Sequence, residues 1–264
     1  MVSMSAVVFD GKQLAREREE LLRQRILNLG KQLKLVSVYF NEDKTGQLYT
    51  RLKGEAAQRV GIGFEKVECA FGDDMELLKK RIKEVCERTD VTGMLIQKPP
   101  KKMYHQELWE QLVVAIDPDK DADGLSPERK VLPATVKAVM TILQGVPLRG
   151  KRVVVVGRSE IVGSPLAREL VKMGMEVQNV GSGEVDLGAV TKQADILVSA
   201  TGREKLITAD MVKEGAVVID VGEPKPDVDF ELVKEKASFI TPVPGGVGPM
   251  TVVSLLENVV ELGQ

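Results

Sequence analysis

The chain has 264 residues, enough for one large domain or two domains of ordinary size. Hydrophobic residues make up 43% of it and charged residues 29%, which is typical of a soluble globular protein and excludes a disordered or fibrous chain. The 37 basic and 39 acidic residues are spread along the sequence, so the net charge of −2 indicates neither a nucleic-acid footprint nor a membrane-surface patch.

Cysteine and histidine are too scarce to form a disulfide framework or a zinc site. The chain has two cysteines, Cys69 and Cys86, and one histidine, His105, which we expect to be a solvated helix residue. The N-terminus lacks a basic flank followed by an apolar stretch, and no apolar run is long enough to span a bilayer. We therefore expect a cytoplasmic protein with no secretory signal, no membrane contact, no nucleic-acid partner and no metal.

The first half of the chain alternates strand and helix patterns, which favours a parallel sheet with helices outside it. Strands are predicted over 6–10, 35–40, 64–70 and 91–97, and helices over 12–29, 47–60, 73–88 and 106–116, with a polar turn over 41–46. The apolar helix positions expected to face the core are Leu14, Leu21, Leu22, Ile26 and Leu27, then Leu48, Leu52, Ala56 and Val60, then Leu77, Leu78 and Ile82.

A second alternation follows the turn region near Pro127 and Pro133. Helices are predicted over 134–143 and 251–262, the last after the turn-rich stretch PVPGGVGPM, and strands over 153–156, 176–180, 196–200, 217–221 and 238–241. The sequence therefore predicts an α/β fold of two lobes with a boundary near 133–150. Since ligands bind at the carboxyl ends of strands in such sheets, we expect the site in a cleft between the lobes.

The stretch Lys151–Pro165, KRVVVVGRSEIVGSP, predicts a buried strand, a glycine turn and a helix. This arrangement aims helix N-terminal amides at a phosphate. In the dinucleotide fingerprint G-x-G-x-x-G, Ser159 takes the second glycine position and Gly163 closes the turn that begins at Gly157. An ordinary strand-to-helix turn is the alternative.

Tyr49 and Lys53 are four residues apart, so they are neighbours on one face of the predicted helix. A lysine held against apolar surface can act as an acid or base, although a lysine that simply extends along that surface would give the same pattern. Gln97 ends a buried strand before two prolines, where an amide can either face a ligand or cap the turn.

The acidic segment Asp117–Gly124, DPDKDADG, has the start of a calcium loop. The ninth and twelfth positions of such a loop are Pro127 and Lys130 here, so we reject calcium binding. Asp123 is a candidate for hydrogen-bonding the amino groups of a ligand, and a solvated acidic turn is the alternative.

Five motifs together resemble those of the methylenetetrahydrofolate dehydrogenase/cyclohydrolase family, the bifunctional FolD proteins. They are YTRLK, GMLIQKPP, DKDADGL, VVVVGRSEIVGSP and ITPVPGGVGPMTVVSLLEN, which extend over nearly the whole chain in the family's order. The last is the most specific.

The resemblance implies NADP-dependent oxidation of 5,10-methylenetetrahydrofolate to 5,10-methenyltetrahydrofolate, followed by hydrolysis to 10-formyltetrahydrofolate. Residues 1–133, completed by the C-terminal helix 249–264, would form the folate-binding and catalytic domain. Residues 134–248 would form a Rossmann dinucleotide-binding domain. It also implies a homodimer that acts on tetrahydrofolate derivatives in one-carbon metabolism and purine biosynthesis.

The resemblance also implies roles for individual residues. Lys53 would transfer the proton during hydrolysis, Tyr49 would contact the pterin and orient Lys53, Gln97 would hydrogen-bond Lys53, and Asp123 would bind the amino-pyrimidine edge. The other expected folate contacts are Ile96, Lys98, Pro242, Val243, Pro244, Gly245 and Gly246. The expected cofactor contacts are Gly157, Arg158, Ser159, Ile161, Gly163, Ser182, Thr201, Gly202 and Glu223.

The second strand of the Rossmann domain ends at Val180-Gly181-Ser182, without the carboxylate that usually binds the ribose 2′-hydroxyl of NAD. Arg158 and Ser182 could instead bind a 2′-phosphate, so we expect NADP. Glu184 is near enough to keep NAD as the alternative.

The chain also departs from the family pattern. The departures are Gly181 and Gly183 for His and Lys, Lys98 for Leu, Glu223 for Ile, Pro226 for Gly, and Ala134 for Cys. None affects Tyr49, Lys53, Gln97 or Asp123. Two other functions stay open: a two-lobe dehydrogenase acting on another small substrate, and a non-catalytic nucleotide-binding module.

Overall fold

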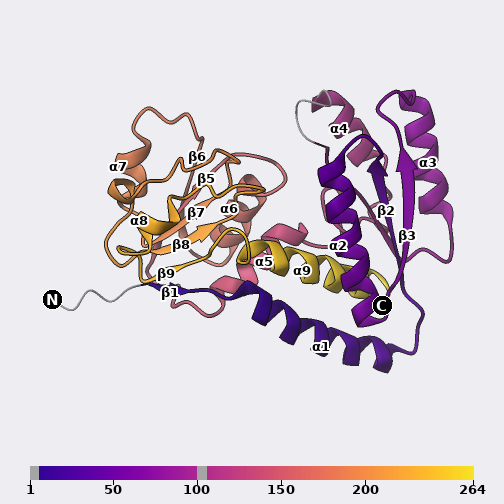
Figure 1. Cartoon of the computed structure of the whole chain (residues 1–264), viewed down its shortest axis with the longest axis horizontal. Helices are drawn as coiled ribbons and strands as arrows, with labels where there is room; N and C mark the ends of the chain where they lie inside the picture. Colours follow the sequence, from indigo (N-terminus) through magenta and orange to yellow (C-terminus); the bar gives the residue numbers. More distant parts are fainter. Residues whose placement is uncertain (1–5, 100–105) are drawn as a thin grey trace. The chain divides into compact units, whose positions relative to one another are not determined.

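The computed structural model describes residues 6–99 and 106–264, which divide into two compact units (Figure 1). One unit contains the residues up to Ala15 together with Thr135–Thr251, and we call it the six-stranded unit. The other contains Arg16–Ala134 together with Val252–Gln264, and we call it the three-stranded unit. The expectation for His105 falls outside the described ranges. Within those ranges, no helix is both long and apolar enough to span a membrane.

The three-stranded unit has a parallel sheet with β2 (Lys34–Phe40) at its centre, between β3 (Gly63–Cys69) and β4 (Gly93–Ile96). Strand β4 is buried along its whole length, which explains its uninterrupted apolar sequence. The helices that contribute to this unit are α1 (Gly11–Leu29), α2 (Lys44–Val60), α3 (Met75–Glu87), α4 (Gln106–Val114) and α9 (Val247–Leu262). Its core joins α1, α2, the sheet and α9 through Ile26, Ala57, Leu95 and Leu256.

Helix α2 buries the predicted positions Ala56 and Val60 but not the predicted positions Leu48 and Leu52. Leu48 and Leu52 are 43% and 40% exposed, whereas Thr50 and Gly54 are buried, together with Ala56, Ala57 and Val60. The buried stripe follows small residues because the helix lies close to the sheet: a Cβ on Gly54 would be only 2.6 Å from the ring of Phe64. Hydrophobicity alone therefore predicted the wrong face for the first two turns.

Other predicted apolar positions are also exposed. In α1, Leu22 and Ile26 are buried but Leu21 and Leu27 face outward, and in α3, Leu77 is exposed beside buried Leu78 and Ile82. A helix whose outer side faces solvent covers only one stripe of its surface, and in α1 and α3 that stripe leaves out Leu21, Leu27 and Leu77.

Two helices begin earlier than the sequence predicted. Helix α2 starts at Lys44, inside the expected polar turn, because the Asp43 carboxylate accepts a hydrogen bond from the Thr45 amide at 3.1 Å and caps it. Helix α9 starts at Val247 rather than at 251. Pro249 lies in its first turn, where the helix needs no backbone N–H.

The six-stranded unit is a parallel sheet with strand order β1-β9-β8-β7-β5-β6. Its strands are β1 (Val7–Val8), β5 (Arg152–Val156), β6 (Glu176–Val180), β7 (Ile196–Ser199), β8 (Val217–Asp220) and β9 (Phe239–Ile240). Its shorter helices are α5 (Ala134–Leu143), α6 (Gly163–Lys172), α7 (Leu187–Thr191) and α8 (Phe230–Val233), with a 3-10 turn at Ala209–Met211.

Strand β5 marks the switch point of this sheet. The chain goes from β5 to β6 on one side and then back to β7 on the other side, so the connections leave β5 in opposite directions. In open α/β sheets, ligands bind at such a switch point, outside the carboxyl ends of the strands. The four valines of β5 are completely buried, as their sequence predicted.

The N-terminal strand belongs with the later part of the sequence. Val7 and Val8 pair in parallel with Phe239 and Ile240 of β9, which places β1 in the six-stranded unit. The expected domain of residues 1–133 therefore differs from the observed division at its N-terminus. The sequence of the short strand predicted over 6–10 does not indicate which of the two sheets it joins.

We predict that Gly54→Ala destabilises the protein. The added methyl group would clash with the Phe64 ring, and such overpacking costs about 1–3 kcal/mol, offset in part by the helix propensity of alanine. Thermal unfolding should show a lower midpoint. Gly188→Ala is the matched control, because it lies in helix α7 with only the Met211 side chain in ordinary contact with its Cβ position, at 3.7 Å, and should unfold no earlier than the wild type. Equal midpoints for Gly54→Ala and the wild type would contradict the close packing.

Candidate active site

Lys53 and Gln97 meet at the carboxyl end of the three-stranded sheet. The Lys53 Nζ donates a hydrogen bond to the Gln97 Oε1 at 3.0 Å. Gln97 directly follows β4. Its backbone N–H donates to the carbonyl of Val38 in β2 at 2.7 Å, so the sheet fixes the backbone of Gln97. Both side chains are half-buried, and Tyr49 lies one helical turn before Lys53 on α2, also half-buried.

Asp123 lies on a loop that is tied to the same sheet. Ala122 donates its amide to the carbonyl of Met94 in β4 at 3.0 Å, and the Asp123 carbonyl accepts from the Ala134 amide at 3.1 Å. The side chain of Asn258, on α9, donates to the carbonyls of Ala122 and Leu132 at 2.9 Å each. The last helix therefore clasps both ends of the segment that carries Asp123.

Asp121 stabilises the acidic turn through hydrogen bonds to backbone amides within it. Its buried carboxylate accepts from the amides of Gly124 at 3.0 Å and Ser126 at 2.6 Å, which closes the turn immediately around Asp123. Gly124 has a φ of +69°, and a Cβ there would be 2.7 Å from the Leu132 backbone, so only glycine fits. Asp121 shapes the loop and leaves the neighbouring carboxylate of Asp123 to act elsewhere.

The charges of this group are coupled. Burial raises the pKa of the Asp123 carboxyl above its ordinary value, while the nearby positive charge of Lys53 opposes the shift and Asp121 adds to it. Lys53, Gln97 and Asp123 thus form one electrostatic cluster, with an amine, an amide and a carboxyl group in reach of one ligand. The arrangement can bind a polar heterocycle and move a proton next to it.

Two other predicted substrate contacts lie beside this cluster in sequence. Ile96 is buried in the sheet. The Nζ of Lys98 lies 5.2 Å from the centre of the Trp109 ring on α4, in a cation–π contact. The lysine that replaces the family's usual leucine is therefore held against this buried tryptophan.

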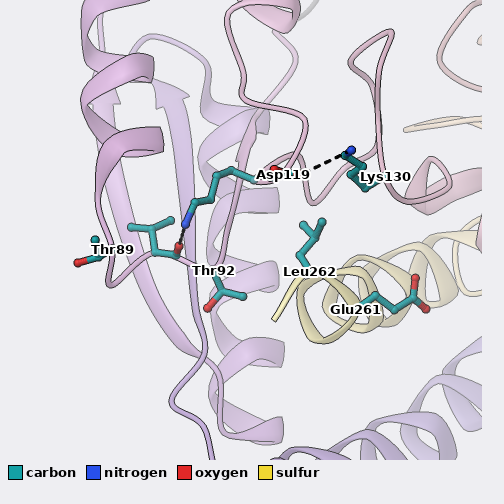
Figure 2. Close-up of a pocket in the computed structure, with 8 residues that line it drawn as sticks. Thr89, Thr92, Asp119, Lys130, Glu261 and Leu262 are labelled. Atoms are coloured by element: carbon teal, nitrogen blue, oxygen red, sulfur yellow. Dashed lines mark hydrogen bonds and ion pairs between the residues drawn. The ribbon is translucent and has the colours of Figure 1, made fainter. Parts of the chain in front are cut away.

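A cavity of about 550 Å³ lies elsewhere in the three-stranded unit (Figure 2). Its lining includes Thr92, immediately before β4, so it opens at the amino end of the strand, opposite Gln97. Its lysines are already paired: Lys120 donates to the Val91 carbonyl, and Lys130 lies 3.8 Å from Asp119. This cavity is separate from the Lys53 cluster. Across residues 6–99 and 106–264, no three His, Cys, Asp or Glu side chains are grouped to hold a metal ion.

The glycine turn after β5 allows three backbone segments to touch. Gly157 has a φ of +119°, and a Cβ there would be 2.3 Å from the Ala200 carbonyl oxygen. A Cβ on Gly163 would be 2.0 Å from the Gly157 carbonyl oxygen. The Ser159 hydroxyl accepts from the amides of Val162 at 3.3 Å and Gly163 at 3.5 Å, so Ser159 holds the turn closed at the start of α6.

The predicted phosphate site lies beside this turn. Arg158 donates to the Asn179 carbonyl from Nε at 3.4 Å and from Nη2 at 3.3 Å, and its Nη2 lies 3.9 Å from the Glu184 carboxylate. Arg203, which sequence reasoning missed, donates to the Ser182 carbonyl at 2.8 Å. Two arginines therefore lie against the loop after β6, with Glu184 paired to one of them.

The remaining predicted cofactor residues also belong to the six-stranded unit. Thr201 and Gly202 lie two and three residues after the end of β7 at Ser199. Ile161 is half-buried in the turn before α6, and Glu223 is exposed after β8. Within the stretch 242–246, the Gly246 amide donates to the Pro242 carbonyl at 2.9 Å, and the Val243–Pro244 peptide is cis. Three further polar residues were missed from sequence: Asn179 and Asp227, which bond to these loops, and Asn258, which bonds to the loop that carries Asp123.

Comparison with known proteins decides the family. Residues 9–123 match the model of the tetrahydrofolate dehydrogenase/cyclohydrolase catalytic domain. Residues 133–264 match that family's NAD(P)-binding domain. The chain belongs to the tetrahydrofolate dehydrogenase/cyclohydrolase family. The resemblance found in the five sequence motifs is thereby confirmed.

Individual relatives agree with this assignment over almost the full length. The chain is 41% identical to the bifunctional protein FolD of Exiguobacterium sibiricum, with 97% of this chain and 99% of that one covered. The bifunctional FolD enzyme of Campylobacter jejuni has a similar structure, with a TM-score of 0.89, 34% identity and 98% of each chain covered. The Trypanosoma brucei FolD, solved with NADP and an inhibitor, has a TM-score of 0.90 and 33% identity over 98% and 97% of the two chains.

Proposed function

We propose that the protein oxidises 5,10-methylenetetrahydrofolate with NADP and then hydrolyses the 5,10-methenyl product to 10-formyltetrahydrofolate. In the first step a hydride leaves the one-carbon bridge of the folate and reduces the nicotinamide, and a methenyl cation remains. In the second step water adds to that cation, a proton is released and one carbon–nitrogen bond opens. Tyr49, Lys53, Gln97 and Asp123 of the three-stranded unit contact the folate, and the glycine turn of the six-stranded unit binds the dinucleotide.

The observation that carries this proposal is the Lys53–Gln97 hydrogen bond beside Asp123. Hydride transfer needs positioning but no protein base, because no proton moves in that step. Water addition releases a proton, so it needs an acceptor near the one-carbon unit. Gln97 fixes the direction of the Lys53 amine, and Lys53 moves the proton.

We predict that Lys53→Met lowers the rate of methenyltetrahydrofolate hydrolysis by at least about a hundredfold, the usual effect of removing a positioned acid-base group. The rate is measured from the loss of methenyl absorbance in a buffer where the spontaneous reaction is subtracted. NADP binding should be unchanged, because the lysine belongs to the folate-binding unit. Lys66→Met, on strand β3, is a control for loss of a lysine from the same unit and should keep wild-type rates. Wild-type hydrolysis by a folded Lys53→Met variant would exclude this role.

We assign Asp123 to the amino-pyrimidine edge of the pterin, where a carboxylate can accept from two N–H groups. Asp123→Ala should raise the folate KM at least tenfold and leave NADP affinity unchanged. Only the ionised carboxylate can accept from both N–H groups, and burial raises the pKa of this carboxyl. As the pH falls, the wild type should therefore lose folate binding at a pH higher than the ordinary pKa of aspartate. Asp123→Asn should lack that pH dependence. Normal folate binding by Asp123→Ala, with only a lower unfolding temperature, would show that the residue merely shapes the turn.

NADP is preferred to NAD in this proposal because of Arg158. Its guanidinium can bind a phosphate with two N–H groups, whereas Glu184 would repel a 2′-phosphate and could accept from a free 2′-hydroxyl. The two side chains already pair with each other at 3.9 Å. A bound 2′-phosphate would therefore replace the Glu184 carboxylate as the partner of Arg158.

We predict that Arg158→Ala weakens NADP binding by about 1.5–3 kcal/mol, the range for a hydrogen bond to a charged group, and leaves NAD binding nearly unchanged. Calorimetric titration of both dinucleotides gives the two affinities. Arg168→Ala removes an exposed arginine of α6 that pairs with Glu160, and it should bind both like the wild type. Tighter binding of NAD than NADP by the wild type, with no effect of Arg158→Ala on NADP, would assign the ribose contact to Glu184.

The proposal includes a homodimer in the cytoplasm, as the family resemblance implies. The two cysteines, Cys69 and Cys86, are both free, as is usual in a reducing compartment. Sedimentation equilibrium measures the assembly, and a mass of one chain at micromolar concentration would rule out the dimer.

A further inference from the structure

The segment after β7 limits how closely the backbone of the glycine turn can approach it. The carbonyl oxygen of Ala200 occupies the space where a Cβ on Gly157 would lie, at 2.3 Å. The Ala200 amide in turn donates to the carbonyl of Val156, the last residue of β5, at 2.8 Å. The turn and the segment 199–202 therefore form one close-packed backbone layer, and a shift of Ala200 would move the turn.

One buried side chain holds both neighbours of Ala200. The Asp227 Oδ2 accepts from the Ser199 hydroxyl at 2.9 Å and from the Thr201 amide at 2.6 Å. Asp227 is fully buried and comes 28 residues after Ser199 in sequence. Its other oxygen, Oδ1, is buried with no hydrogen-bond partner in the described part of the chain. The contacts to Ser199 and Thr201 therefore satisfy only Oδ2 of this buried side chain.

A second carboxylate holds Asp227 itself. Asp220, the last residue of β8, accepts at Oδ1 from the amides of Gly222 at 2.8 Å and Asp227 at 3.1 Å, and at Oδ2 from Val228 at 3.0 Å. These three bonds fold the loop 221–228 back on the end of its own strand. The Asp227 side chain is thereby presented from a fixed backbone to the end of β7.

We propose that Asp227 is a positioning residue of the dinucleotide site. It sets the place of Thr201 and Gly202, and through Ala200 the place of Gly157, so that their backbones approach the dinucleotide at the correct distance. The inference rests on the proposed function, which assigns Thr201, Gly202 and Gly157 to the cofactor. Asp227 does not itself contact the cofactor in this proposal.

The test compares NADP affinity among variants by direct calorimetric titration, with the KM for NADP measured in parallel. Asp227→Ala should weaken NADP binding at least tenfold, because both hydrogen bonds are lost. Asp227→Asn should stay within about threefold of the wild type, because the amide oxygen can accept both bonds. Ser199→Ala removes one bond from the other side and should give an intermediate loss. Asp229→Asn is the matched control, because it removes a carboxylate two residues away that pairs with Lys205 at 3.5 Å. This variant should bind NADP like the wild type.

Two further readouts separate positioning from folding. Methenyltetrahydrofolate hydrolysis without NADP should keep its wild-type rate in Ser199→Ala and Asp227→Asn, whereas a general loss of structure would lower it together with the unfolding temperature. Unchanged NADP affinity in Asp227→Ala overturns the inference, as does a parallel loss of both activities in every variant. If Asp227→Ala does not fold, unchanged affinity in Ser199→Ala overturns it instead.

The same titration distinguishes this inference from the proposed function. A wild-type protein that binds NADP but turns over no folate contradicts the proposed function, while the affinities of the variants still decide the role of Asp227. A wild-type protein that binds neither dinucleotide overturns both.

Discussion

Direct backbone contact around Gly157 is the constraint on which the dinucleotide-binding unit depends. The Gly157 Cα faces the Ala200 carbonyl, and the Gly163 Cα faces the Gly157 carbonyl, with no space for a Cβ at either position. The end of β5, the start of α6 and the segment after β7 are thus held in direct backbone contact, although β7 comes about 40 residues after β5 in sequence. The polar side chains of Ser159, Asn179 and Asp227 bond to the backbone around this contact.

The three-stranded unit reaches its geometry mainly through side chains that bond to backbone. Asn258 joins two ends of a loop, Asp121 closes the turn inside it, and the backbone of Gln97 is bonded to β2. Lys53 approaches from α2, whose close packing on the sheet requires Gly54. Both units therefore place their functional groups at strand ends, one with glycine contacts and the other with long-range hydrogen bonds.

The sequence predicted the elements well where one local pattern decides them. The valines of β5 were found because a run of adjacent apolar β-branched residues indicates a buried strand. The helix at Ala134–Leu143 was found because its apolar residues are spaced as on one face of a helix. The buried face of α2 was mistaken because Leu48 and Leu52 are apolar but the sheet admits only small residues there. Tyr49, Lys53, Gln97 and Asp123 were selected by family motifs, since their spacing alone did not favour a functional role over a structural one.

Asp227 and Asn258 could not be recognised from sequence for a physical reason. Asp227 accepts from the Thr201 amide and the Ser199 hydroxyl, 26 and 28 residues away, and Asn258 donates to carbonyls 126 and 136 residues away. Such isolated long-range contacts leave no periodicity in the sequence, and most of the partner atoms belong to the backbone, which every amino acid has.

The clasp made by Asn258 has a consequence for the order of events during synthesis. The residues around Lys53 and Asp123 leave the ribosome first, but the helix that secures the Asp123 loop comes 136 residues after Ala122. The residues between them must all be translated before the three-stranded unit can complete its core with Leu256 and Val259. Until then that half exposes apolar surface, and chaperone contact is most useful in this interval.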